Sequence, residues 1–346
     1  MTGIALNNAT ERRVRNNELL PIIDIGPYLK GRPGAEAALA DELRKTCEGI
    51  GFFFITNHGI DPALIAESFE QSRRFFDMPI EAKIKSAMNE SQSGYQPIKA
   101  SVYRDNLSIN NKRGSISEAY KYTFDLQKND PDFGSGRRFR DQPNWPSSLP
   151  GFRDFAQRYI RAFDAVANKL LAPLALSLGL PRNFFADSFD RSTSAVRLAH
   201  YPQVPEDERD GNMGSYPHQD LSFLTLIPPT DVPGLDVLLP GGEWLEVPRI
   251  DGGVLVNTGL ALQHWTDSHY KATPHRVRIP QEMERFSNIF FYYPNLEARI
   301  EAPTGFQSAN PKGNRDAMTF EQMHIDYCNR NFQYVNALPK TAERVV

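Results

Sequence analysis

The sequence predicts a mainly β protein with flanking helices, whose core is a distorted double-stranded β-helix, the jelly roll of cupin-like proteins. Short β-rich runs, separated by glycine and proline turns, fill residues 195–293, and strands at such short intervals favour a sandwich or a barrel. Within them, His218 and Asp220 have the spacing of paired metal ligands, and a metal site suits the mouth of a double-sheet jelly roll. We expect helices to brace its outer face.

Most elements outside this region are predicted to be helical. The expected order is a short strand at 21–25, a helix at 35–50, a buried strand at 51–56, a second helix at 62–76, a long helix at 152–180 and a last helix at 318–331. The first helix carries apolar residues among charged ones and is ended by Gly51. Residues 88–97 and 100–113 are polar and lack periodicity, which predicts loop or lid.

Composition excludes several classes of protein. The chain has 346 residues, 39 basic and 42 acidic, with a net charge of −3 and no long run of one sign, so no nucleic-acid partner is expected. Two cysteines are too few for a disulfide framework and indicate a reducing compartment. No apolar stretch is long enough to span a membrane, and residues 1–17 are too polar for a signal peptide. We therefore expect a cytoplasmic protein, and make no prediction of its oligomeric state.

The candidate metal ligands are His218, Asp220 and His275. Side chains at i and i+2 of a β-strand point to the same face, so His218 and Asp220 can reach one ion while Gln219 turns away. One short strand cannot surround a metal, and His275 lies 55 positions beyond Asp220, far enough to be on another strand. Two imidazoles and one carboxylate suit one face of an octahedral ferrous ion and leave three coordination positions open.

A candidate anion clamp follows the third ligand. In 275–279, His, Val and Ile alternate with two arginines, which predicts a strand. Residues 280–284 are predicted to form a turn, and 285–289 a strand that runs back. Arg285 and Ser287 share a face of that strand by the same period of two. If the returning strand pairs with the one carrying His275, that face holds the metal. An arginine fork matches a carboxylate bidentately, and the serine hydroxyl donates beside it.

Each of these residues could also have a purely structural role or occur by chance. A bare His-x-Asp occurs by chance in many chains, whereas the same pair with a distal histidine and Arg-x-Ser on alternating strands is far harder to explain by accident. The chain has seven histidines, so few rival triads exist. We expect His58 to cap a turn or pack against the core, His264 and His269 to be structural, and His200 to point away from whatever Tyr201 faces.

Segment 197–295 resembles the catalytic domain of the iron(II)/2-oxoglutarate-dependent oxygenases, in the branch similar to isopenicillin N synthase. The matching text is RLAHYP at 197–202, HQD at 218–220, LTL at 224–226, PGLDV at 233–237, WLEVP at 244–248, VNTG at 256–259, HRV at 275–277 and RFS at 285–287. PIID at 21–24 and GFFFITNHG at 51–59 resemble the opening region of the same family. The match covers most of the chain, and 100–145 is its least familiar tract.

The resemblance implies one structural unit over 1–346 with several regions. They are an N-terminal family region with helices and lid loops at 20–145, bracing helices at 146–190, the catalytic jelly-roll core at 191–300, and a C-terminal loop and helix at 301–346. It places the iron ligands on His218, Asp220 and His275. It places the carboxylate contacts of 2-oxoglutarate on Arg285 and Ser287, with Tyr201 as a hydroxyl partner.

The activity implied by the resemblance is oxidation of a C–H bond of a small molecule. Iron(II), 2-oxoglutarate and dioxygen would take part, with succinate and CO2 as coproducts and ascorbate as the in vitro reductant. The outcome is hydroxylation, desaturation or ring formation. Two departures, Ala199 with His200 in place of Asn-Tyr, and Leu260 where relatives often have Asp, leave the triad intact but weaken any transfer of substrate identity.

Other functions stay open at this point. One is an iron oxidase of the isopenicillin N synthase type, which needs no oxo-acid and uses Arg-x-Ser to hold a substrate carboxylate. Another is cleavage of 2-oxoglutarate to ethylene. A zinc hydrolase with the same three ligands and a non-catalytic cupin-like binding module belong to different classes, and a zinc site more often lacks the attached Arg-x-Ser clamp.

The substrate pocket is the least determined part of the site. Phe291 shares the face of Arg285 and Ser287 and is expected in the pocket wall. The other candidates come from the loop-rich N-terminal half: Tyr103, Arg104, Tyr120, Tyr122 and Phe124. Their ordinary interpretation is that of strand or loop aromatics and one surface charge.

Overall fold

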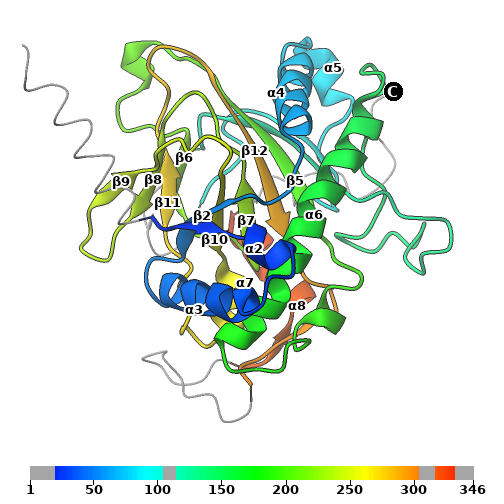
Figure 1. The fold of residues 1–346 in the computed structure, drawn as a ribbon. Coiled ribbons are helices and arrows are strands. Elements are labelled where there is room, and N and C mark those ends of the chain that lie inside the picture. The colour runs from blue at the N-terminus through cyan, green and yellow to red at the C-terminus, as the bar shows by residue number, and fades with distance from the viewer. Residues whose placement is uncertain (1–19, 104–113, 304–315, 332–346) are drawn as a thin grey trace, which may run out of the picture.

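Two β-sheets that face each other form the centre of the protein, and helices cover the outer side of the larger sheet (Figure 1). The computed structural model describes residues 20–103, 114–303 and 316–331. This arrangement confirms the predicted mainly β fold with a double-stranded β-helix core. Among the described residues, no helix is both long and apolar enough to cross a lipid bilayer.

The larger sheet has eight strands and the smaller sheet has four. The larger runs, in spatial order, β1 (Ile22–Asp24), β2 (Phe52–Thr56), β10 (Val254–Thr258), β7 (Leu224–Ile227), β12 (Arg285–Tyr292), β5 (Ala195–Tyr201), β4 (Glu118–Thr123) and β3 (Gly94–Gln96). The smaller runs β6 (Ser215–His218), β11 (His275–Val277), β8 (Leu235–Leu238) and β9 (Trp244–Glu246). A third sheet joins β13 (Arg299–Ile300) to β14 (Met318–Thr319).

The helices lie mainly outside the sheets. They are α2 (Gly26–Leu29), α3 (Ala35–Glu48), α4 (Pro62–Phe76), α5 (Ile80–Ile84), α6 (Phe152–Ser177), α7 (Leu260–Trp265) and α8 (Phe320–Asn331), with two short 3₁₀ helices, η1 (Ala186–Ser188) and η2 (Glu206–Glu208). The predicted helix at 62–76 is confirmed, and its N-terminus is capped by the Asp61 carboxylate, which accepts a hydrogen bond from the Ala63 amide at 2.8 Å.

Strand β12 shows how the sheet separates an outer core from an inner space. On its outer side, the Phe290 ring lies 5.9 Å from Phe163 of α6, and Asn288 is bonded to Ser68 and Ser72 of α4. Its alternate residues, beginning with Arg285, therefore face the space between the two sheets. Across that space, the ring of Phe52 on β2 lies 5.5 Å from His275 on β11.

Three expectations about local structure need correction. Residues 88–97 are not all loop, because β3 pairs with β4 there. The predicted helix at 318–331 begins as β14 and becomes helical at Phe320. The strand after the 280–284 turn does not pair with the one carrying His275. Strand β11 pairs with β6 and β8 in the smaller sheet, whereas β12 pairs with β5 and β7 in the larger.

Candidate metal centre

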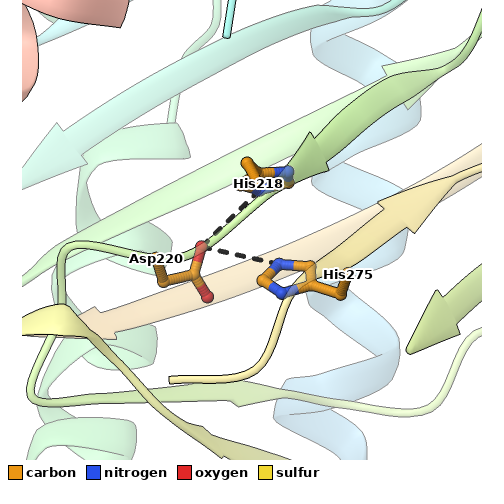
Figure 2. A group of neighbouring side chains, drawn as sticks. All are labelled: His218, Asp220 and His275. Carbon is orange, nitrogen blue, oxygen red and sulfur yellow. Dashed lines mark ion pairs between the residues drawn. The ribbon is translucent and has the colours of Figure 1, made fainter. Parts of the chain in front are cut away.

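The three predicted metal ligands meet in the space between the sheets (Figure 2). His218 is the last residue of β6 and lies opposite His275, the first residue of β11. Oδ1 of Asp220 is 3.7 Å from Nε2 of His218 and 3.6 Å from Nε2 of His275. One prediction is corrected in detail: β6 ends at His218, so Asp220 is carried by the turn that follows the strand.

Hydrogen bonds hold Asp220 and His218 through the atoms that face away from the three converging ligand atoms. Oδ2 of Asp220 accepts hydrogen bonds from Oγ1 of Thr225 at 2.7 Å and from Nδ2 of Asn257 at 3.0 Å, which leaves Oδ1 facing the imidazoles. Nδ1 of His218 lies 2.8 Å from the carbonyl oxygen of Tyr216. A carbonyl only accepts, so Nδ1 carries the proton and Nε2 offers its lone pair.

Burial and charge put His218 and Asp220 in the protonation states that a cation needs. Burial, followed by the neighbouring imidazole of His275, lowers the pKa of His218 to about 3, so His218 is neutral at pH 7. Burial alone would raise the pKa of Asp220. The two imidazoles and the hydrogen bonds from Asn257 and Thr225 outweigh burial and lower that pKa below its ordinary value.

The donor set fits one transition-metal ion. Donors that each lie about 2.1 Å from an ion are separated by about 3.0 to 4.2 Å as the angle between them opens from 90° to 180°, and both measured separations fall within this range. Across the residues that the structure describes, this is the one cluster of histidine, cysteine and acidic side chains that could hold a metal. Two imidazoles with one carboxylate and open positions are typical of non-haem iron(II).

Arg285, Ser287 and Tyr201 lie on the opposite wall of the same space. Arg285 pairs with Tyr201 across β12 and β5, and its guanidinium carbon is 5.1 Å from the centre of the Tyr201 ring. Nε of Arg285 donates to the Val232 carbonyl at 3.1 Å. Its Nη1 is buried without a hydrogen-bond partner among the described residues. A buried, unsatisfied guanidinium donor is costly, so this atom has room for a hydrogen-bond acceptor that the described residues do not supply.

A pocket beside the metal ligands includes two of the predicted substrate residues. It is lined by Met88, Gln92, Gln96, Tyr103, Lys121, Arg197, Asp220, Leu221, Phe291, Tyr293, His324 and Tyr327. Tyr103 stacks on His218 with ring centres 4.1 Å apart and planes inclined by 16°. Phe291 stacks on Tyr293 at 5.8 Å. Arg104 lies outside the described residues.

The assignment of Tyr120, Tyr122 and Phe124 to this pocket is wrong. Tyr120 and Tyr122 point to the other face of β4, where their rings lie 5.4 and 6.3 Å from Phe152 of α6. Phe124 packs against the same outer core. By the alternation of a strand, it is Lys121, between the two tyrosines, that faces the pocket.

Sequence reasoning also missed the residues that hold Asp220 and two pocket cations. Asn257 is a buried amide that directly follows the apolar residues 254–256 of β10, and that change in polarity was the available signal. Nothing local distinguishes Thr225 from any other threonine in a strand. Lys121 and Arg197 are opposite each other on β4 and β5, and only the pairing of those strands brings them together.

Comparisons with known proteins agree with this geometry. Residues 20–148 match the family model described as the N-terminal part of non-haem dioxygenases in morphine synthesis, and residues 192–294 match the model of the 2OG-Fe(II) oxygenase superfamily. The chain is 31% identical to the 2-oxoglutarate-Fe(II) type oxidoreductase hxnY of Emericella nidulans, over 80% of this chain and 79% of that protein. It is 33% identical to the 2-oxoglutarate-dependent dioxygenase citB of Monascus ruber, over 81% and 86% of the two chains.

A solved structure shares the fold over most of its length. It is that of a full-length Neurospora crassa protein in complex with alpha-KG and thymine, with a TM-score of 0.75 and 25% sequence identity, covering 89% of this chain and 97% of that one.

Proposed function

This chain belongs to the 2OG-Fe(II) oxygenase superfamily and is a 2-oxoglutarate-dependent dioxygenase with iron(II) as its metal, and from that premise we propose which of its residues carry the reaction. We assign the iron to His218, Asp220 and His275. The single observation that carries this assignment is the buried carboxylate oxygen of Asp220, which faces two imidazole Nε2 atoms at 3.6 and 3.7 Å. Thr225 and Asn257 act as positioning residues, because they occupy the other oxygen.

We assign the far carboxylate of 2-oxoglutarate to Arg285, Ser287 and Tyr201. The unsatisfied Nη1 of Arg285 supports this, because a carboxylate would supply the missing acceptor. Ser287 lies two residues along the same face of β12, and Tyr201 lies opposite Arg285 on β5. All three are buried, so the clamp binds its anion away from bulk water, where charge-assisted hydrogen bonds are strongest.

The cofactors supply the oxidation, and the protein supplies binding and orientation. When bound, iron(II) with 2-oxoglutarate and dioxygen oxidises a C–H bond of a small molecule and releases succinate and CO2. We propose that the substrate enters the pocket lined by Tyr103 and Phe291. Tyr103 lies flat on His218 and so limits how the substrate approaches the iron ligands.

The comparisons do not favour the alternatives. The curated relatives are named as 2-oxoglutarate-dependent enzymes, which argues against an oxo-acid-independent oxidase, a zinc hydrolase and a binding module, and neither relative is named for ethylene formation. The relatives also point to small-molecule substrates, since the solved Neurospora protein is in complex with thymine. We further propose the cytoplasm as the compartment, because both Cys47 and Cys328 are free, buried thiols.

Anaerobic titration with iron(II), followed by 2-oxoglutarate, tests the metal assignment. His218→Ala and Asp220→Ala should each abolish stoichiometric iron binding and succinate formation while leaving the circular dichroism spectrum unchanged. Asp231→Ala removes an exposed aspartate of the surface pair with Arg249 and is the matched control, which should load normally. Wild-type iron binding and turnover in either ligand variant would refute the assignment.

A further inference from the structure

Two cations lie side by side in the substrate pocket. Lys121 of β4 and Arg197 of β5 are directly opposite each other in the antiparallel pair, and both line the pocket that contains Asp220. Strand β12, which pairs with the other side of β5, carries no acid here, because its residue opposite Arg197 is Ile289. Like charges directly opposite on paired strands destabilise a sheet, so this arrangement needs a reason beyond stability.

The ammonium of Lys121 is not neutralised by the described part of the pocket. It lies 5.5 Å from the centre of the Tyr293 ring and has no carboxylate or hydrogen-bond partner among the described residues. Nη1 of the neighbouring Arg197 donates to the Tyr103 hydroxyl at 3.4 Å. The only acid in the described lining is Asp220, which the proposed function gives to iron.

The neighbouring titratable groups are neutral. Burial lowers the pKa of His324 well below its usual range, and burial raises the pKa of the Cys328 thiol to about 11. Burial also lowers the pKa of Lys121 to about 8, which still leaves most of the population charged at pH 7. The described lining of the pocket therefore contains two cationic side chains, Lys121 and Arg197, and one acid, Asp220.

The loaded site does not supply the missing negative charge. The charges of iron(II) and Arg285 together balance those of Asp220 and a dianionic 2-oxoglutarate. With both cofactors bound, none of these negative charges is left over to balance the positive charge of Lys121, which lies opposite the positive charge of Arg197. Burying charge without a partner is costly, and an anion on the substrate would supply the partner that Lys121 lacks among the described residues.

We propose that the substrate is a small molecule bearing one anionic group, a carboxylate or a phosphate, that Lys121 and Arg197 bind together. This inference rests on the proposed function, since it fills the same pocket. The rings of Tyr103, Phe291 and Tyr293 in the lining suit a flat, apolar part of the substrate beside that anionic group.

The test compares ligands that differ in charge and little else. The wild-type enzyme is loaded anaerobically with iron(II) and saturating 2-oxoglutarate, so that the Arg285 clamp is occupied. Phenylacetate, its uncharged analogue phenylacetamide, and phenyl phosphate are then titrated by calorimetry. Hydrogen bonds to charged groups contribute about 1.5–3 kcal/mol, so the better anion should bind about 10- to 100-fold more tightly than the amide.

Variants assign that preference to the proposed residues. Lys121→Met keeps the length of the side chain but should remove most of the preference for the anion, whereas Lys121→Arg should retain it. Arg197→Met is the second variant, because Arg197 also contacts Tyr103. Lys85→Met removes an exposed lysine outside the pocket and should behave as wild type.

Each outcome decides the question. Tighter binding of phenylacetate identifies a carboxylate, and tighter binding of phenyl phosphate identifies a phosphate. Equal affinity for anion and amide, no binding of any probe to the loaded enzyme, or a preference that survives in Lys121→Met would overturn this proposal alone. Failure to load iron or 2-oxoglutarate would instead overturn the proposed function, and this inference with it.

Discussion

The side-chain amide of Asn257 donates a 3.0 Å hydrogen bond to Oδ2 of Asp220, from the larger sheet to the turn that follows β6. Together with Thr225, it fixes the rotation of the carboxylate, so that the remaining oxygen points at both imidazoles. Asn257 contacts neither imidazole by hydrogen bond, and its effect on a metal would pass through Asp220 alone.

Asn257→Ala should therefore weaken iron(II) binding without removing a ligand. Loss of such an orienting partner costs about 10- to 100-fold in metal affinity, measured here as the anaerobic Kd for iron(II). Asn288→Ala is the matched control. It deletes another buried amide, but one bonded to Ser68 and Ser72 of α4 on the far side of the larger sheet. Wild-type affinity in folded Asn257→Ala would show that Thr225 alone positions the carboxylate.

Arg285→Gln should raise the apparent KM for 2-oxoglutarate by at least about tenfold, because a buried charge-assisted, bidentate contact is lost. Arg285→Lys should recover only part of the affinity, since an ammonium lacks the planar fork. Succinate formation measures KM, and anaerobic calorimetry measures the Kd. The control is Arg278→Gln, an arginine that pairs with Asp236 and Glu246 at the surface of the smaller sheet. An unchanged KM in Arg285→Gln would move the oxo-acid elsewhere.

The period-two rule predicted that Arg285 and Ser287 share a face of one strand, and they do. It predicted the same for His218 and Asp220, although β6 ends at His218. It could not say which sheet each strand joins. Strands separated by a short turn usually pair, yet β11 and β12 lie in opposite sheets. Arg285 and Ser287 lie on the wall that faces the triad, so they border the expected space although the predicted strand pairing was wrong.

The prediction that Tyr120, Tyr122 and Phe124 line the substrate pocket was wrong for a related reason. Both faces of β4 are largely buried, so polarity does not reveal which one faces the pocket. Aromatic Tyr120 and Tyr122 suggested a substrate surface, but they pack on α6, and the charged Lys121 faces inward. That outcome depends on where a helix more than 25 residues further along the chain packs, which no local pattern encodes.

Lys83→Met should lower the free energy of unfolding by about 3–5 kcal/mol, because it leaves a buried carboxylate without its cation. Lys83 lies 2.8 Å from Glu118, and both side chains are less than 10% exposed. Glu118 also accepts hydrogen bonds from Tyr95 and from His200, so it cannot leave the network. Urea denaturation gives the change, and the double variant Lys83→Met with Glu118→Gln should recover part of it. Equal losses in the single and double variants would mean that the buried charge is not the cause.

Asp164 of α6 should make the protein less stable as pH rises through mildly acidic values. Burial raises the pKa of this carboxyl from 3.8 to about 6, against hydrogen bonds from Ser192 and Asn168 that lower it. Between those two values the folded protein keeps a proton that the unfolded chain has released, so the contribution of Asp164 to stability is full below 3.8 and is lost as pH approaches and passes about 6.

Asp164→Asn replaces the ionisable carboxyl group with an amide that does not titrate, so comparison with wild type isolates the contribution of Asp164 to the pH dependence of stability. The unfolding free energy of wild type minus that of Asp164→Asn should fall across this window and then stay constant, as measured by urea denaturation at a series of pH values. Asp154→Asn, an exposed aspartate in the first turn of the same helix, controls for loss of a negative charge. A flat difference for Asp164→Asn would mean that water or the two hydrogen bonds compensate for burial, because the folded and unfolded states would then release the proton together.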